Sequence, residues 1–293
     1  MKTHVVKLKA NRKTLSAYLK EDMNLSSRKA KKLLKDGIAV NNKKAYGDMK
    51  LKDGDILYIE EDKSRDNILP EKMEISVLYE DEHILAVNKP PYMVIHPTKT
   101  HMEGTLANGI RFYFDERGIE EPVRFFNRID MNTSGIVLIA KSSQAHSLLD
   151  RYSAKTMEKK YIAIVSGHIE KKEGRISLPI SNEADQEGRR NISDQGSLAI
   201  TDYKVLEEFE SSSLISVSII TGKTHQIRVH FSSIGNPLLG DRLYGGENDM
   251  IDRQALHASE LNFLHPIYKK PISIKADLPN DMLLLLKMLK GEA

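Results

Sequence analysis

Short apolar segments separated by polar turns dominate the chain after residue 75, and they constrain its fold more than any other feature. A helix is expected over residues 143–152, but helices and apolar segments do not alternate in the regular order of a parallel α/β sheet. The pattern therefore predicts an α+β fold with a mixed, mainly antiparallel central sheet. The expected strands cover residues 77–79, 84–87, 136–139, 161–165 and 214–220.

The first 60 residues are far more basic than the rest of the chain. They carry 15 Lys and Arg against 7 Asp and Glu, a balance of +8, whereas the whole chain has a formal net charge of +3. This asymmetry is typical of a basic module that binds a polyanion and is joined to a body with another task. A basic surface that is merely solvated would explain the charge equally well.

A helix is expected within this basic part. Ser26 or Ser27 can cap its N-terminus, and Gly37 can end it. With a period of 3.6 residues per turn, apolar side chains lie on one face and four cations lie on the opposite face. Mutual repulsion of these cations would cost stability unless an anion such as a phosphate backbone lies against them. The residues predicted to bind this anion are Arg28, Lys31, Lys32 and Lys35.

After this helix we expect a short strand at residues 38–40, a turn at Asn41-Asn42 and a second strand at residues 56–59. This order resembles the S4 RNA-binding domain, and residues 35–41 (Lys-Asp-Gly-Ile-Ala-Val-Asn) and 54–56 (Gly-Asp-Ile) carry the resemblance. The resemblance implies a small α/β domain that binds structured RNA and has no chemistry of its own. We therefore expect an S4-like domain over residues 1–62, a polar linker over residues 63–74 and a second domain over residues 75–293.

Several kinds of functional site are not expected from the sequence. Without any Cys, the chain has no disulfide, no thiolate nucleophile and no Cys-based zinc site. His225 and His230 lie in a predicted strand, where their spacing turns them to opposite faces and away from a common metal ion. The segment 222–224 looks like the end of a phosphate-binding loop, but Val217 occupies the required upstream glycine position. We expect neither a metal ion nor a cofactor.

The sequence also predicts a protein that is neither secreted nor inserted in a membrane. It contains no run of about 18 apolar residues. The segment 1–10 lacks the apolar core and the cleavage site of a secretory signal. We expect a cytoplasmic protein that acts as a monomer.

Three polar clusters beside predicted strands are candidates for chemistry. Arg128 and Asp130 precede the strand at residues 136–139, where a scaffold could aim them rigidly, although a cap for the following turn is the more ordinary role for Asp130. The segment 221–230 reads as a strand whose polar side chains share one face and line a cleft or face solvent. Tyr161 opens another strand, a position where a tyrosine is usually a packing residue.

Taken in order, these clusters resemble the RluA/RluD-type pseudouridine synthase family. The resemblance covers about residues 76–275. Tyr92, Asn127 and Lys223 depart from the Gly, His and Arg that are usual at these positions. The matching motifs are Asn88-Lys89-Pro90, His96-Pro97, Arg128-Ile129-Asp130, Thr133-Ser134-Gly135, Lys159-Lys160-Tyr161, residues 201–207, 221–230 and 240–245, Leu256-His257-Ala258 and Phe263-Leu264-His265-Pro266.

The resemblance implies an isomerase that converts uridine in structured RNA to pseudouridine without a cofactor. It assigns the nucleophile to Asp130, which could attack the sugar or the base, or remove a sugar proton. Tyr161 would stack on the uracil and could take the final proton from C5. Arg228 would pair with Asp130, and its opposite charge would favour the carboxylate form.

The resemblance implies RNA contacts for three further cations. Arg128 would fill the stack that a flipped uridine leaves, and Lys89 and Lys223 would neutralise nearby phosphates. The combination with an S4-like domain favours large-subunit ribosomal RNA as the substrate, with tRNA as an alternative. A non-catalytic RNA-binding assembly factor and a nucleoside hydrolase are the other hypotheses. The intact site residues argue against the first, and the lack of a second carboxylate beside Asp130 argues against the second.

Overall fold

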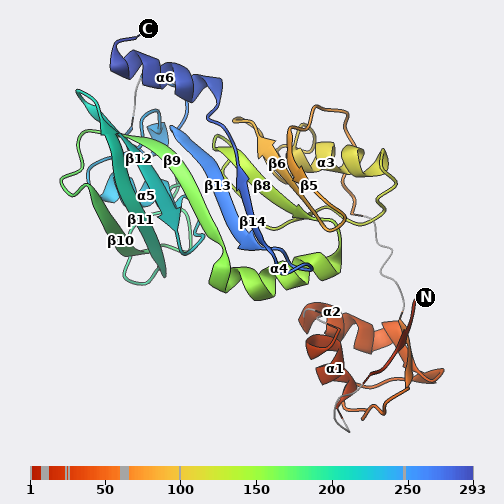
Figure 1. The fold of residues 1–293 in the computed structure, drawn as a ribbon. Helices are drawn as coiled ribbons and strands as arrows, with labels where there is room; N and C mark the ends of the chain where they lie inside the picture. Colours follow the sequence, from red (N-terminus) through yellow and green to blue (C-terminus); the bar gives the residue numbers. More distant parts are fainter. Residues whose placement is uncertain are drawn as a thin grey trace.

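The computed structural model contains two β-sheets, one from the basic N-terminal part and one from the rest of the chain (Figure 1). Each sheet packs against its own cluster of buried apolar side chains. The described residues are 2–7, 13–23, 25, 27–59, 66–98, 100–246 and 249–292, without the side chains of Lys2, Arg28, Lys29, Asp36 and residues 153–155.

The N-terminal sheet has four antiparallel strands in the order β1-β4-β2-β3. The predicted helix begins at Ser27 and ends at Gly37, but its last five residues form a π-helix, and Ser26 lies outside the described residues. Asn41 and Asn42 form the predicted turn with φ of 49° and 63°, a conformation that Asn adopts more readily than most residues. The elements are β1 (Lys2–Val5), α1 (Leu15–Glu21), α2 (Ser27–Lys32), η1 (Leu33–Gly37), β2 (Ile38–Val40), β3 (Lys43–Lys44) and β4 (Ile56–Ile59).

The second sheet has ten strands, of which eight follow the order β10-β11-β12-β9-β13-β8-β6-β5, while β7 pairs with β8 and β14 pairs with β13. The pairings of the described strands are antiparallel except for the parallel pair of β13 and β8. The predicted α+β fold with a mixed, mainly antiparallel sheet is therefore confirmed, and the strands expected over residues 77–79, 84–87, 136–139, 161–165 and 214–220 are found, the last of them ending at Ile219. The strands are β5 (Val77–Glu80), β6 (Ile84–Lys89), β7 (Arg124–Phe125), β8 (Ser134–Ala140), β9 (Glu158–Ser166), β10 (Glu173–Ile180), β11 (Ser197–Glu208), β12 (Ser212–Ile219), β13 (Leu256–Leu264) and β14 (Pro271–Lys275).

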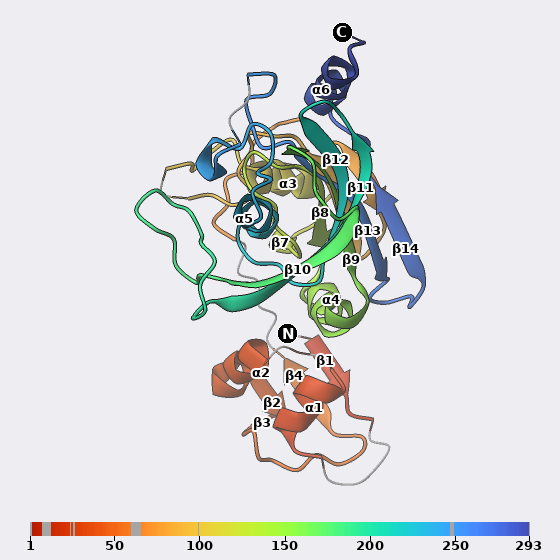
Figure 2. The same ribbon diagram turned by 90° about the vertical axis from the view of Figure 1, so that its left-hand side faces the viewer.

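Helices cover both faces of the large sheet. Along β8, Val137 and Ile139 pack against α3, whereas Leu138 packs against α4 on the opposite face, which explains the uninterrupted apolar sequence of this strand. Figure 2 shows α5 and α3 together inside the curve of the sheet. Within the described part of the chain, no helix combines the length and the apolar character needed to cross a membrane. The helices are α3 (Leu106–Asp115), α4 (Ser143–Thr156), α5 (Gln226–Ser233) and α6 (Asn280–Lys290).

The prediction of a strand over residues 221–230 is wrong, because this segment turns and then forms helix α5. β12 ends at Ile219, and His225, with a φ of 56°, is the left-handed residue that immediately precedes the helix. Ile227 and Phe231, one helical turn apart, pack on the sheet. Over so few residues, alternating polar and apolar side chains do not distinguish a strand from a buried helix. The polar side chains expected on one strand face are all buried: Gln226, Arg228 and His230.

The described part of the predicted linker runs along α3. The amide of Asn108 on α3 donates to the carbonyl of Leu69 over 2.8 Å, and the N–H of Glu71 donates to the carbonyl of Asn108 over 3.1 Å. Asp66 accepts from the N–H of Val123 over 2.6 Å. Residues 63–65 of this predicted linker lie outside the described residues, so the contacts concern residues 66–74.

Candidate active site

A cleft of about 280 Å³ lies on the face of the large sheet that carries α5. The loop between β7 and β8 forms one wall with residues 126–130, and the segment 222–228 that leads into α5 forms another. Lys159 and Tyr161 of β9 also line the cleft. The three polar clusters singled out in the sequence therefore meet in one place.

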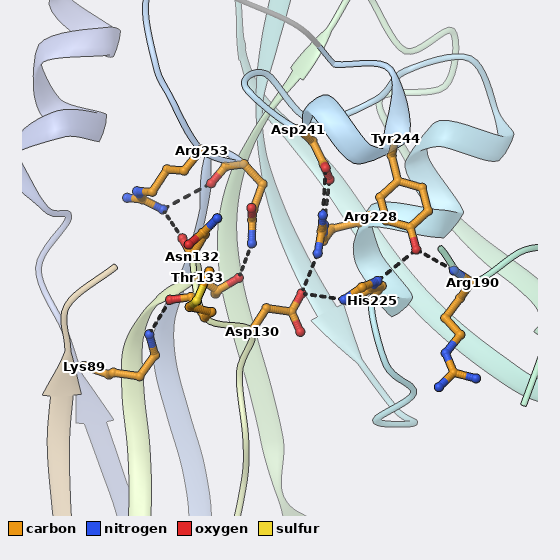
Figure 3. A network of polar contacts seen from close by, with 12 residues as sticks. Lys89, Asp130, Asn132, Thr133, Arg190, His225, Arg228, Asp241, Tyr244 and Arg253 are labelled. Carbon is orange, nitrogen blue, oxygen red and sulfur yellow. Dashed lines mark hydrogen bonds and ion pairs between the residues drawn. The ribbon is translucent and has the colours of Figure 1, made fainter. Parts of the chain in front are cut away.

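Asp130 and Arg228 meet in this cleft. Nη1 of Arg228 donates to Oδ2 of Asp130 over 3.1 Å (Figure 3). The carbonyl oxygen of Asp130 accepts from the N–H of Thr133 over 3.1 Å, so the anticipated turn exists but is closed by the backbone. Among the described residues, none donates a hydrogen bond to the other carboxylate oxygen, Oδ1. The side chain is thus held on one side and open on the other.

A second carboxylate, which the sequence analysis did not assign to the site, fixes Arg228. Asp241 is 1% exposed and accepts from Nε of Arg228 over 2.7 Å and from Nη2 over 2.8 Å. The guanidinium also lies 4.9 Å from the centroid of the Tyr244 ring. Burial opposes the charge on Arg228, but the bonds to Asp241 and Asp130 outweigh it and raise the pKa of Arg228. The guanidinium is therefore charged and fixed in direction.

The approach of Asp241 depends on the glycine before it. Gly240 has a φ of 75°, and a Cβ at this position would overlap the carbonyl oxygen of Arg253. The sequence showed residues 240–245 only as a matching motif. The one sequence signal for Asp241 is that a carboxylate directly follows a glycine within this matching motif. No chemical role is assigned to the motif from the sequence.

The remaining predicted residues of the cleft differ in exposure. Tyr161 is buried, and burial together with the charge of Asp130 raises its pKa, so the phenol is neutral near pH 7. Arg128 and Lys223 are exposed on the two walls. Lys159 is partly buried, and burial lowers its pKa. The cations available to a polyanion at this cleft are therefore mainly Arg128 and Lys223.

The burial of Lys89 contradicts the predicted contact between this side chain and an RNA phosphate. Lys89 is 0% exposed, and its Nζ donates to the carbonyl oxygens of Pro90, Met93 and Met131 over 2.8, 2.9 and 2.9 Å. Burial, together with the charge of Arg253, lowers the pKa of Lys89 to about 7. These three hydrogen bonds tie the loop after β6 to Met131, the residue that follows Asp130. The Lys89 side chain is not accessible to RNA.

A buried arginine anchors the same loop from the other side. Arg253 is 1% exposed, and its Nη1 donates to the carbonyl oxygen of Asn132 over 3.1 Å. Its Nε and Nη2 donate to Asp281 of α6 over 2.6 and 2.9 Å. The amide of Gln254 donates to the hydroxyl of Thr133 over 3.2 Å. No local pattern in the sequence indicates these contacts, because the partners lie far apart in the chain.

His225 lies beside Asp130 in the cleft. Its Nε2 is 4.0 Å from Oδ2 of Asp130, and its Nδ1 is 2.9 Å from the hydroxyl of Tyr244 (Figure 3). That hydroxyl accepts from the backbone N–H of Arg190 over 2.8 Å. Burial lowers the pKa of His225, so the imidazole is neutral near pH 7. The sequence raises His225 only as a candidate metal ligand and does not predict its position beside Asp130.

Comparison with known proteins now identifies the family. Residues 83–233 match the family described as RNA pseudouridylate synthase. The uncharacterized RNA pseudouridine synthase YhcT of Bacillus subtilis (strain 168) is 39% identical over 249 residues, which cover 84% of this chain and 82% of the relative. The chain belongs to the RNA pseudouridylate synthase family. It is an RNA-modifying isomerase.

Two further proteins are similar to this chain, one a relative whose name states its substrate and one a solved structure. The ribosomal large subunit pseudouridine synthase D of Zymomonas mobilis subsp. mobilis (strain ATCC 31821 / ZM4 / CP4) is 36% identical to this synthase over 237 residues, covering 75% of this chain and 74% of the relative. The solved structure of human RNA pseudouridylate synthase domain containing 1 superposes with a TM-score of 0.58 at 29% identity, covering 70% of this chain and 84% of the human one. The structural match agrees with the fold of the larger sheet described above.

The basic face of the N-terminal part of the synthase is solvent-exposed. Lys31, Lys32 and Lys35 are exposed, whereas Ala30 and Leu33 of the same helical segment are buried. The predicted separation of basic and apolar faces is therefore present for these side chains. The side chain of Arg28, the fourth predicted cation, lies outside the described residues.

Proposed function

We propose that this synthase isomerises uridines of large-subunit ribosomal RNA with Asp130 as its nucleophile. The observation that carries the proposal is the setting of the Asp130 carboxylate. Oδ2 is bound by the buried Arg228, Oδ1 accepts no hydrogen bond from the described residues, and Asp130 lines the cleft. A carboxylate that is fixed on one side and open on the other fits attack on a bound nucleotide, or proton removal from it.

The reaction needs no further reagent. The bond between C1′ and N1 of uridine breaks, a bond between C1′ and C5 of the same base forms, C5 loses a proton and N1 gains one. Asp130 either bonds transiently to the sugar or the base or removes a sugar proton. A phenol must ionise before it can take the C5 proton, and the raised pKa of Tyr161 opposes this ionisation. Tyr161 therefore fits a packing role against the uracil.

The cations of the cleft support a role in handling RNA. A uridine inside folded RNA must leave its stack at a cost of a few kcal/mol. Arg128 is exposed beside Asp130, and its planar guanidinium suits the space that the flipped base vacates. Lys223 is exposed on the other wall, where it would meet a backbone phosphate.

The N-terminal part supports the choice of a large, structured RNA. We assign residues 1–62 to an S4-like RNA-binding domain, residues 63–74 to a linker and residues 75–293 to the catalytic domain, because the two sheets have separate cores. Lys31, Lys32 and Lys35 would contact phosphates and raise the effective concentration of RNA at the cleft. The name of the Zymomonas mobilis relative points to the large ribosomal subunit.

The proposed working form is a monomer in the cytoplasm. A ribosomal RNA substrate places the reaction where ribosomes are assembled.

The substrate is tested by mapping pseudouridines through carbodiimide treatment and primer extension in a strain that lacks the gene. Large-subunit RNA should lose specific stops, and these should return with the wild-type gene but not with Asp130→Asn. Stops lost only from tRNA would overturn the ribosomal assignment. Stops restored by Asp130→Asn would overturn the role of this carboxylate.

A further inference from the structure

His225 has a backbone conformation and a position that packing alone does not explain. Its φ of 56° lies in the left-handed region, which carries a steric penalty for residues other than glycine. Such strained residues persist where neighbouring contacts fix them, and they are frequent at functional sites. His225 lines the same cleft as Asp130 and directly precedes the helix that carries Arg228.

Two contacts select the same tautomer of His225. The hydroxyl oxygen of Tyr244 accepts from the backbone N–H of Arg190. The hydroxyl proton of Tyr244 can be donated to Nδ1 of His225, which lies 2.9 Å from the hydroxyl oxygen. With Nδ1 accepting, the ring proton lies on Nε2. Nε2 faces Oδ2 of Asp130, which can only accept a proton from a donor. Both neighbours therefore favour an imidazole that carries its proton on Nε2.

Among the residues that the structure describes, none accepts a hydrogen bond from this Nε2–H. The distance of 4.0 Å to Oδ2 of Asp130 is too long for a hydrogen bond, and that oxygen is already bound by Arg228. The charged groups around the ring oppose each other, since Asp130 and Asp241 favour the imidazolium whereas Arg228 and Arg190 disfavour it. Burial then keeps the ring neutral.

We propose that His225 is a neutral hydrogen-bond donor to an oxygen of the flipped nucleotide, either a uracil carbonyl or a ribose hydroxyl, and that Tyr244 is the positioning residue that sets its tautomer. This inference rests on the proposed function of the cleft. When the bond between C1′ and N1 breaks, negative charge spreads onto the uracil carbonyl oxygens. A fixed donor in a water-poor site stabilises such charge without reorganisation.

Two substitutions of His225 separate the donor from the fold. His225→Asn places its amide near the position of Nδ1 and removes the donor at Nε2, and Asn tolerates a positive φ. His225→Gln places an amide N–H close to the position of Nε2. We expect the Asn variant to lose about 10- to 100-fold in kcat with RNA affinity and thermal unfolding unchanged, and the Gln variant to recover a large part of kcat.

A third variant tests the positioning role. Tyr244→Phe keeps the ring under Arg228 but removes the donor to Nδ1, so the neutral imidazole can carry its proton on Nδ1 and lose the donor at Nε2. Relative to the wild type, its kcat should therefore be reduced at pH 8 and should recover as the pH drops to 6, because the imidazolium carries a proton on both nitrogens. The same kcat profile in both proteins would overturn the role of Tyr244.

The measurement is tritium release from RNA labelled with [5-³H]uridine, with the wild type and Asp130→Asn run in parallel. If the wild type releases no tritium, the proposed function fails. If the wild type is active and His225→Asn is equally active, only the role of His225 fails. On RNA with 2′-deoxyuridine at the target, a persisting defect of His225→Asn assigns the acceptor to a uracil carbonyl, and a vanishing defect assigns it to the 2′-hydroxyl. An equal loss in the Asn and Gln variants would also overturn the proposed donor.

Discussion

The buried pair of Arg228 and Asp241 leads to a quantitative prediction for Asp241→Asn. The substitution keeps the shape of the side chain but removes its charge, and its amide N–H group would face the guanidinium donors. Removing one partner of a buried ion pair costs about 3–5 kcal/mol, because the remaining charge is no longer compensated. Asp130 still holds Nη1 of Arg228, so we expect the lower end of this range, a loss of about 3 kcal/mol in the free energy of unfolding.

An exposed pair with the same geometry provides the control. Arg175 donates to Asp202 from Nε over 2.6 Å and from Nη2 over 2.9 Å, but these side chains are 57% and 37% exposed. Asp202→Asn should therefore cost about 1 kcal/mol or less. Urea unfolding followed by circular dichroism measures both variants. Equal losses would refute the reasoning that burial of the pair decides its contribution.

The same substitution should also affect the reaction. Without Asp241, the guanidinium of Arg228 can turn away from Asp130, so kcat should fall by at least about 10-fold in the tritium-release assay. Asp202→Asn should leave kcat unchanged, because the side chains of this pair are exposed and do not line the cleft. A variant at Asp241 that is destabilised but fully active would show that the position of Arg228 does not depend on this carboxylate.

Two lysines and three histidines give further predictions. Lys89→Met should lower the free energy of unfolding by about 3 kcal/mol in urea, because three buried carbonyls lose a donor, whereas Lys223→Ala should leave it unchanged. Lys223→Ala should instead lower RNA affinity and reduce the slope of log affinity against log salt by about 1 in filter binding. Stability should fall from pH 7 to pH 5, because burial lowers the pKa values of His225, His230 and His257 and the unfolded chain then binds more protons. Urea unfolding across this range that showed rising stability would contradict the last prediction.

The sheet could be predicted because the burial of its strands produces short runs of apolar residues in the sequence. β8 is covered on both faces, so it reads as a continuous apolar run, and the helix over residues 143–156 follows it with an apolar face toward the sheet. The segment 226–230 misled the prediction for a physical reason. Its buried polar side chains have partners inside the protein, and such a helix has no polar face to mark its period.

The site could be predicted in part from the order of motifs. Asp130, Arg228 and Tyr161 were expected and lie at one cleft. The supports around them could not be read from the sequence, because their partners are brought together only by the fold. Lys89 binds the carbonyl oxygen of Met131, and a buried lysine has no local pattern that distinguishes it from one that contacts RNA.

We propose that the carboxylate of Asp130, held by Arg228, carries out the isomerisation of uridine. The most direct measurement is single-turnover release of tritium from [5-³H]uridine-labelled large-subunit RNA by the wild type and by Asp130→Asn, with RNA affinity measured on the same samples. We expect the variant to bind RNA as the wild type does and to react at least about 1,000-fold more slowly. Release at the wild-type rate by a folded Asp130→Asn protein would contradict the claim.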